Sequence, residues 1–388
     1  MNKDFHFFAT YTAARLAGFT IDEAYVIGAA SQFTDMCTKT FLDAIGGPVS
    51  AATTQVNAEL IKVRMDVVGR QDITRIWSSF HFLPYDLYAK APWGNKNYQD
   101  KYALICAPNG PLVQEIVKLA HGKGLEAAGI CCHTLADTWA HAFFAGTPSL
   151  AINNVTSADC YELIDQDGQT IERPVRFLHR PTMSDNLKEG TYVQSVFAPE
   201  EHSIMNLGHG RCGHLPDYSF IRYRYLSAWG DYKATIKDNQ KDFYLAISQM
   251  AHALRYLHGD VETFELNTYE DELLAPYEIE LRALLAKRQL DAAADWKRLT
   301  ERIFGEAPPA FEHDHVQREY VAADKKAKPK TELGRYFHHA MSQKSLVTNR
   351  IWKSGNRLAG RSIEMGEGIK GVIEDYLALI QAEVKDRD

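Results

Sequence analysis

The stretch from His133 to His141, with the sequence HTLADTWAH, places a histidine, an aspartate and a second histidine four residues apart from one another. In a helix with about 3.6 residues per turn, these side chains share one face, and the outer two lie roughly 12 Å apart. The two histidines are too far apart to bind one ion directly, whereas Asp137 lies one turn from each. Because imidazole nitrogens and carboxylate oxygens are the usual zinc ligands, the pattern predicts a metal cluster with a bridging aspartate.

A second group of metal-ligand residue types lies in residues 207–220, whose sequence is LGHGRCGHLPDYSF. Either His209 or His214 could bind an ion together with Asp217, and the sequence leaves that choice open. The glycines of this segment allow positive φ angles, so the backbone can approach an ion closely. Arg211 carries a permanent, forked charge that suits a phosphate oxygen, so we predict a phosphate-binding catalytic role for it. The alternative interpretation is a tight glycine loop with surface histidines.

Weaker candidates are scattered along the rest of the chain. His6, Asp35 and His81 each stand in an apolar context, where a single such residue is more often a hydrogen-bonded core residue. Beside the two clusters, they become candidate metal ligands. His179 and His202 could protonate a leaving oxygen, although an ordinary surface position is the simpler interpretation for both.

Taken in chain order, these residues resemble the ligand set of zinc-dependent phospholipase C and the P1/S1 nuclease superfamily. Those all-α enzymes use a histidine near the N-terminus, an aspartate, a histidine, an HxxxD helix with a further histidine, and a later histidine followed by an acidic residue. The resemblance covers roughly residues 1 to 220. The HTLADTWAH and GHGRCGHLPD segments also resemble an uncharacterised bacterial family of unknown function.

The superfamily resemblance implies a centre of two or three zinc ions and assigns ligands by position. The inner pair of ions would be held by Asp35, His81, His133 and Asp137. His6 would join Asp137 on one ion. Another ion would be held by His141, His214 and Asp217. The chain departs from the pattern in two ways, since Met1 stands where the superfamily has a processed N-terminal tryptophan, and His141 follows Asp137 by four residues instead of six. Both departures favour a dinuclear centre.

The implied chemistry is hydrolysis of a phosphoester by a metal-activated water. Asp35 or Asp137 could orient that water and accept its proton, while Arg211 could bind the phosphate. The substrate classes are a phospholipid, a nucleotide or a small phosphodiester. Two alternatives stay open: a metal-dependent hydrolase of another bond such as an amide, and a non-enzymatic effector or binding protein with a structural metal site. No GxxxxGK[ST] loop or GxSxG motif is present in the sequence.

Composition describes an ordinary globular protein. The 388 residues are 45% hydrophobic, and the net charge of -7 argues against a general polyanion-binding surface, so no stable nucleic-acid complex is expected. The N-terminal sequence has no secretory pattern and no stretch is apolar enough to span a membrane, which predicts a cytoplasmic protein. The six cysteines are scattered, and we interpret them as buried reduced thiols.

The elements that must position the candidate residues are mostly helices. Apolar spacing and capping signals predict helices over residues 4–17, from Thr20 toward Asp35, over 111–121, over 125–144 and through 243–257. Asp167 and Gly168, between two alternating segments, predict a small β-hairpin in an insertion at about residues 150–200. We therefore expect a mainly all-α fold, a multi-helix bundle around a buried metal site. Residues 1–262 would form the catalytic domain, and residues 263–388 a helical C-terminal appendage.

Overall fold

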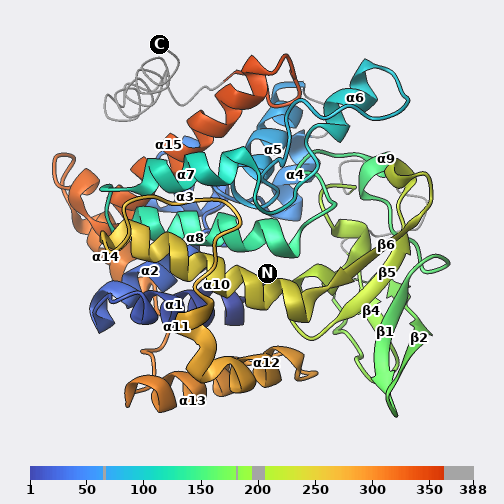
Figure 1. Ribbon diagram of the computed structural model, residues 1–388. Coiled ribbons are helices and arrows are strands. Elements are labelled where there is room, and N and C mark those ends of the chain that lie inside the picture. Colours follow the sequence, from blue (N-terminus) through green and yellow to red (C-terminus); the bar gives the residue numbers. More distant parts are fainter. Residues whose placement is uncertain (64–66, 181, 195–205, 362–388) are drawn as a thin grey trace.

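The computed structural model describes residues 1–63, 67–180, 182–194 and 206–361 of the chain (Figure 1). This part is rich in helices but also contains a small antiparallel sheet and a short parallel strand pair at one end of the molecule. The expected all-α class therefore holds for the helical body alone. No helix within the described ranges is both long enough and apolar enough to cross a membrane.

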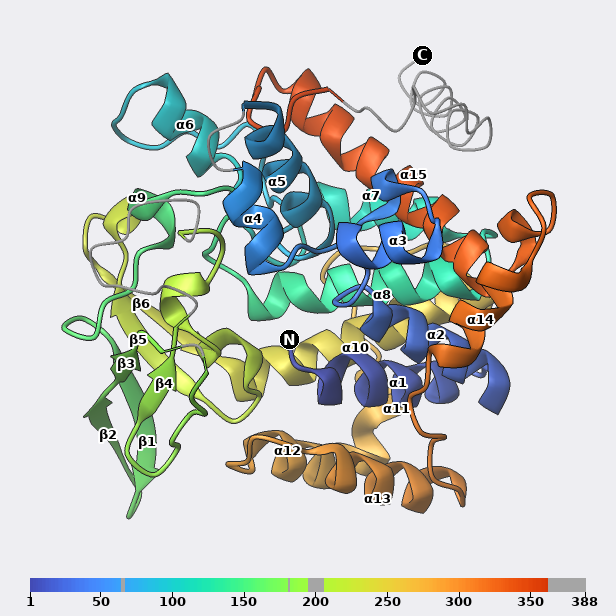
Figure 2. The same cartoon turned by 180° about the vertical axis from the view of Figure 1, so that it is seen from behind.

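Helix α8 (Leu125–Ala140) runs through the middle of the helical body, and almost every one of its side chains is buried. It packs against α2 (Ile21–Phe33), α10 (Asn239–His258) and α15 (Glu332–Lys353) (Figures 1 and 2). Gly129 permits the closest of these contacts, because a Cβ atom there would collide with the Ile27 carbonyl oxygen of α2. Because α8 is surrounded in this way, its polar side chains can contact only groups that neighbouring segments of the chain supply.

The N-terminal segment contains the predicted capping box, and its first predicted helix consists of a π-helix followed by an α-helix. Residues Asp4–Ala9 form a π-helix, which continues as the α-helix α1 (Thr10–Leu16). The hydroxyl of Thr20 accepts from the Glu23 backbone N–H while the Glu23 carboxylate accepts from the Thr20 N–H, so the predicted capping box opens α2. Single-turn π-helical segments are often found at functional sites, and this one carries His6.

Besides α8, the described residues between α2 and the sheet form six further helices, of which the sequence pattern predicts α7. They are α3 (Lys39–Ile45), α4 (Asn57–Val63), α5 (Val67–Phe80), α6 (Lys96–Tyr102), α7 (Pro111–Ala120) and α9 (Leu150–Asn153). Helix α7 begins at the predicted proline. Helix α8 ends at Ala140 rather than near residue 144, so its last predicted turn is absent.

The predicted hairpin is present and belongs to a larger sheet. Strands β1 (Tyr161–Gln166) and β2 (Gln169–Pro174) are joined by Asp167 and Gly168, which adopt φ angles of 50° and 78°. The antiparallel sheet has the order β2-β1-β5-β6 and is completed by β5 (Arg222–Leu226) and β6 (Ala234–Asp238). Strands β3 (Arg176–Leu178) and β4 (Thr191–Val193) form the parallel pair.

The helices after residue 262 pack on the body formed by the preceding residues. They are α11 (Asp271–Leu274), α12 (Glu278–Ala286), α13 (Ala293–Phe304), α14 (Asp314–Ala322) and α15. Helix α15 lies against α5, α7 and α8, while α12 and α13 lie beneath the N-terminal helices in both views (Figures 1 and 2). The expected boundary near residue 262 stays a prediction, and the end of the proposed appendage lies outside the described residues. Short 3₁₀ turns cover Val49–Ala51, Gly210–Cys212, Leu215–Asp217, Ala228–Gly230, Ala275–Tyr277 and Lys328–Lys330.

Candidate metal centre

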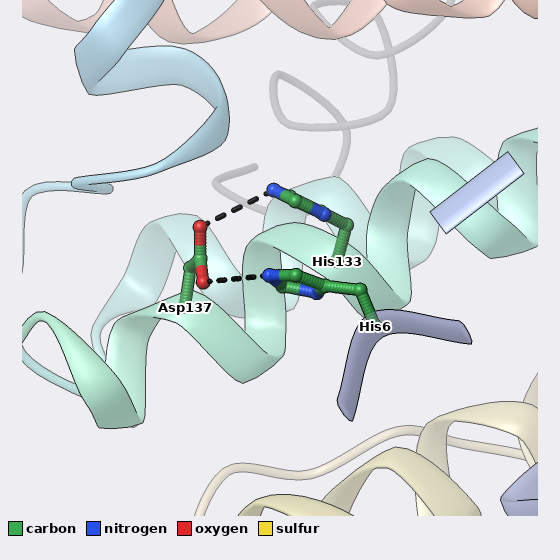
Figure 3. Close-up of side chains that lie close together, drawn as sticks. All are labelled: His6, His133 and Asp137. Atoms are coloured by element: carbon green, nitrogen blue, oxygen red, sulfur yellow. Dashed lines mark ion pairs between the residues drawn. The ribbon is translucent and has the colours of Figure 1, made fainter. Parts of the chain in front are cut away.

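Helix α8 contributes His133 and Asp137, which lie one turn apart on the same face, as their spacing predicts (Figure 3). The His133 Nε2 atom lies 3.2 Å from Asp137 Oδ2, and His6 Nε2 lies 3.2 Å from Asp137 Oδ1. All three side chains are buried, with relative exposures of 0 to 1%. The two carboxylate oxygens of Asp137 therefore face two different imidazoles.

His6 reaches this position from the N-terminal π-helix, and its ring stacks on that of His133 with centroids 3.8 Å apart. Neither ring nitrogen of His6 makes a hydrogen bond to any of the described residues, although both are buried. A buried polar nitrogen without a hydrogen bond costs free energy, and a metal ion bound to it would remove that cost. The two ring nitrogens of His6, buried without a hydrogen bond, are therefore the first observation that fits a metal site.

Asp35 and His81 form a second group with His133. Asp35 follows the end of α2 and His81 follows the end of α5, so two helix ends meet the face of α8. The His81 Nδ1 atom lies 3.1 Å from Asp137 Oδ2 and 3.2 Å from His133 Nε2. The Asp35 carboxylate is 3.7 Å from His133 Nε2, and its side chain is 30% exposed. The group is thus buried on one side and open on the other.

A third group joins His141, His209 and Asp217. The Asp217 Oδ1 atom lies 3.3 Å from His141 Nε2 and 3.5 Å from His209 Nε2. The expectation that His141 lies within the helix was wrong, because α8 ends at Ala140 and His141 is its C-cap. At this end of the helix, the His141 ring lies between the two carboxylates, with Nδ1 3.6 Å from Asp137 Oδ2 and Nε2 facing Asp217.

His214 lies beside the third group rather than within it. Its Nδ1 atom is 3.1 Å from Asp217 Oδ2, and its side chain is 60% exposed. The hydrogen bond with the Asp217 carboxylate raises the pKa of His214. The geometry therefore groups His209 with Asp217 and leaves His214 as a partner of the carboxylate, a distinction that the sequence left open.

Backbone carbonyl oxygens hold the rings of four candidate ligand histidines. In each ring, one nitrogen lies at hydrogen-bond distance from a carbonyl and the other faces the cluster. The contacts are His81 to Thr53 at 3.0 Å, His133 to Ser31 at 2.8 Å, His141 to His81 at 2.7 Å and His209 to Gly213 at 2.8 Å. Metal-binding histidines almost always donate their second N–H in this way, because the bond fixes both tautomer and orientation. The arrangement is the second observation that fits a metal.

The amino group of Met1 is the contributor that sequence reasoning missed. It lies 2.8 Å from Asp137 Oδ1, 3.4 Å from Asp217 Oδ1 and 3.4 Å from His141 Nε2. Burial opposes its charge, but the carboxylates of Asp137 and Asp217 prevail and raise its pKa to about 10. In the superfamily, the terminal ligands are the amine and carbonyl of a processed N-terminal tryptophan, so the departure at Met1 concerned that processing. The structure nevertheless places the Met1 amine beside the carboxylates of Asp137 and Asp217.

Electrostatics prepares these groups for cation binding. Burial would raise the pKa values of Asp137 and Asp217, but the neighbouring imidazoles and the Met1 ammonium hold both well below the usual range. Burial lowers the pKa of His6 to about 4, assisted by His133 and the Met1 ammonium, and burial also lowers that of His209 to about 4. The carboxylates are therefore ionised and these two imidazoles neutral near pH 7, the forms in which both residue types bind metals.

A cavity of about 480 Å³ opens beside the three groups. Its candidate ligands are Asp35, His81, His141, His209 and Asp217, and its apolar lining includes Trp77, Leu207 and Leu290. His6, His133 and Asp137 lie deeper, beneath this surface. A small molecule in the cavity would meet candidate ligands of the second and third groups directly.

Other predicted residues lie elsewhere. Arg211 is buried, its Nη1 atom donates to Asn206 Oδ1 at 3.2 Å, and it does not line the cavity, so the geometry does not support a phosphate-binding role. His179 does not line the cavity either, and His202 lies outside the described residues. The six cysteines are free and buried, as predicted.

Fold and site together define a helix-rich protein with a buried histidine and aspartate cluster suited to metal ions. The chain belongs to a family of unknown function (DUF6765), whose model matches residues 1–352. The match covers α8, the glycine-rich segment and most of the C-terminal helices. No curated protein and no solved structure shows a significant match to the chain.

Proposed function

We propose that this protein is a zinc-dependent hydrolase of phosphoester bonds. The observation that carries the proposal is the sharing of Asp137, whose two carboxylate oxygens face different imidazoles within a row of three donor groups. Multinuclear hydrolases use such shared carboxylates to hold ions about 3.5 to 4 Å apart. The resemblance to the phospholipase C and P1/S1 nuclease superfamily supports the same reaction class.

Three zinc ions would match the three donor groups, one more than the sequence favoured. The first would be held by His6, Asp137 and the Met1 amino group, which must lose the proton that its raised pKa retains before it can bind an ion. The second would be held by Asp35, His81, His133 and Asp137. The third would be held by His141, His209 and Asp217. Nitrogen and carboxylate donors without thiolates suit zinc, and Mg²⁺ and Ca²⁺ prefer all-oxygen sites.

Bound zinc would acidify a water molecule and neutralise charge that builds on the phosphoryl oxygens. Among the chain's own groups, Asp35 is best placed to orient that water and accept its proton, because its carboxylate lines the cavity and is partly exposed. Asp137 is fully buried, so its role is to hold the donor groups together. The imidazoles tied to backbone carbonyls would hold any ions through their other ring nitrogens, because the carbonyl contacts fix the ring orientations.

The openness of the site favours catalysis over a purely structural metal. Structural zinc sites are closed by four protein ligands, whereas catalytic sites keep a position for water or substrate. Here the second and third groups border a cavity through Asp35, His81 and Asp217. The substrate is a small phosphodiester, a nucleotide or a phospholipid, the classes whose phosphate can reach this surface.

Elemental analysis of the purified protein, together with an assay on bis-p-nitrophenyl phosphate, tests the proposal. We expect more than one zinc ion per chain and hydrolysis that a chelator abolishes. Asp137→Asn should lose both metal and turnover, while Asp165→Asn, which changes a 64% exposed carboxylate of the β1–β2 hairpin, should lose neither. Bound zinc without phosphodiester hydrolysis would contradict the proposed reaction, and a protein that binds no zinc would contradict the metal centre itself.

A further inference from the structure

The hairpin of α12 and α13 (residues 278–304) lies directly against the first nine residues of the chain, which we term the N-terminal arm (Figures 1 and 2). The arm carries two of the donors that contact Asp137, namely the Met1 amino group and His6. Leu290, in the connection between α12 and α13, also lines the cavity. A region far along the chain therefore borders both the arm and the candidate site.

Asp4 makes the polar contact between the arm and this hairpin. Its Oδ2 atom accepts a hydrogen bond of 2.6 Å from the backbone N–H of Ala292, and its side chain is buried. Ala292 is the N-cap of α13 and offers no side-chain cap, so the Asp4 carboxylate also lies at the positive end of that helix. Burial raises the pKa of Asp4, and the hydrogen bond from Ala292 opposes that rise, so this bond favours the carboxylate in this one position.

Apolar contacts and a second polar contact extend the same interface. The Phe5 ring meets the Trp296 ring edge to face, with centroids 6.4 Å apart. The hydroxyls of Thr12 and Thr300 lie 3.1 Å apart. The side chain of Asp4 thus fixes the arm at the residue where the π-helix begins, between the two donors that must reach Asp137.

We propose that Asp4 is a positioning residue of the metal centre and that the α12–α13 hairpin is part of that centre rather than an appendage. By accepting the Ala292 N–H, Asp4 holds the arm so that Met1 and His6 both face Asp137 Oδ1. This inference rests on the proposed function, because it concerns the ion that the arm helps to bind. It predicts a selective effect on that ion, since the other two donor groups take no ligand from the arm.

Zinc titration of the metal-free full-length protein, followed by calorimetry, tests the inference. The wild type should bind three ions, and Asp4→Ala should weaken one of them by tenfold or more while the other two keep their affinity. Asp4→Asn should restore binding of the ion held by His6, Asp137 and Met1, because its amide oxygen can still accept the Ala292 N–H. The matched control is Arg298→Ala, which removes the ion pair with Asp295 within the same hairpin from a side chain that is 67% exposed.

The outcomes separate positioning from general stability. Equal weakening of all three ions, or three unchanged affinities in Asp4→Ala, would overturn the inference. If Asp4→Ala does not fold, the isosteric Thr300→Val loosens the same interface from the hairpin side and should weaken the same single ion several-fold, and an unchanged affinity would again overturn it. A wild type that binds no zinc would refute the proposed function and the inference together, whereas three ions bound equally by every variant would refute only the inference.

Discussion

The candidate centre has two parts that are built differently. The helix part comprises the donors grouped around α8, and the loop part comprises the donors around the glycine-rich segment. Their members are His6, Asp35, His81, His133 and Asp137 in the helix part, and His141, His209 and Asp217 in the loop part. In the helix part, the two α8 residues are at most 1% exposed, whereas the side chains of Asp217 and His209 are 12% and 19% exposed. A helical period fixes which residues share a face, but a loop of short 3₁₀ turns does not.

Replacing the shared carboxylate should separate the two parts most strongly. Asp137→Asn removes the charge that faces His6, His81 and His133, so we expect the helix part to lose its zinc and activity to fall on the order of 10³- to 10⁴-fold. Asp217→Asn should release only the ion of the loop part and lower activity roughly 10- to 100-fold. Elemental analysis and kcat/KM measurements on both variants check this.

The order of these two effects is the informative result. Equal metal loss in Asp137→Asn and Asp217→Asn would mean that the two parts bind their ions as one unit. A larger loss in the loop variant would mean that Asp137 is not the shared ligand.

The Met1 amino group connects the two parts, because it lies near Asp137 Oδ1 and Asp217 Oδ1 alike. Adding a short peptide before Met1 would replace this amine by an uncharged peptide N–H at a fully buried position. We expect one zinc ion to bind at least about tenfold more weakly. The same peptide added after Asp388 is the control and should change nothing, so an equal effect of both additions would remove Met1 from the site.

Within the loop part, the two histidines provide a matched pair. His209→Ala should release the ion of that part, because the His209 ring faces Asp217 and its other nitrogen is fixed by the Gly213 carbonyl. His214→Ala should retain the ion, since His214 lies 60% exposed on the far oxygen of Asp217. Zinc stoichiometry after dialysis decides between them. If His214→Ala loses the ion and His209→Ala retains it, the superfamily assignment of His214 is the better one.

These two histidines show where sequence reasoning reaches its limit. The helix period brought His133 and Asp137 to one face, and the capping box at Thr20 and the turn at Asp167 were recognisable because each is a local pattern. The choice between His209 and His214 depends on the φ angles of Gly208 and Gly213, which are 52° and 57°. Those angles are permitted by glycine but not specified by it.

The remaining differences come from contacts between distant segments. The charge of Arg211 predicts a phosphate ligand, yet the fold places its guanidinium beside Asn206 in the interior. The helices after residue 262 were recognisable as helices, but nothing in their local pattern indicates that Ala292 would meet Asp4. Contacts of this kind depend on the fold of the whole chain. The sequence therefore identified the candidate metal ligands better than the residues that hold those ligands in place.

The smallest effect should come from a support of the helix part that lies on α15. The Tyr336 hydroxyl donates to Thr34 Oγ1 at 3.1 Å, and Thr53, whose hydroxyl donates to the Thr34 carbonyl, holds His81 through its own carbonyl. Tyr336→Phe removes the buried hydrogen-bond contacts of this hydroxyl with Thr34 and Thr53, which should cost about 1 to 3 kcal/mol of stability and weaken zinc in the helix part a few-fold.

The loop part meets this network at the contact of His141 Nδ1 with the His81 carbonyl, which Tyr336→Phe leaves in place, so its ion should keep its affinity in Tyr336→Phe. Thermal unfolding measures the stability change, and zinc titration of the metal-free variant measures the two parts separately. Tyr320→Phe, a buried tyrosine on α14 away from His81, is the matched control and should leave every ion unchanged. Equal weakening of zinc binding in both parts by Tyr336→Phe would show that the loop part depends on the helix part for its geometry. The two parts would then differ in the secondary structure that carries their ligands, but they would bind zinc as one unit.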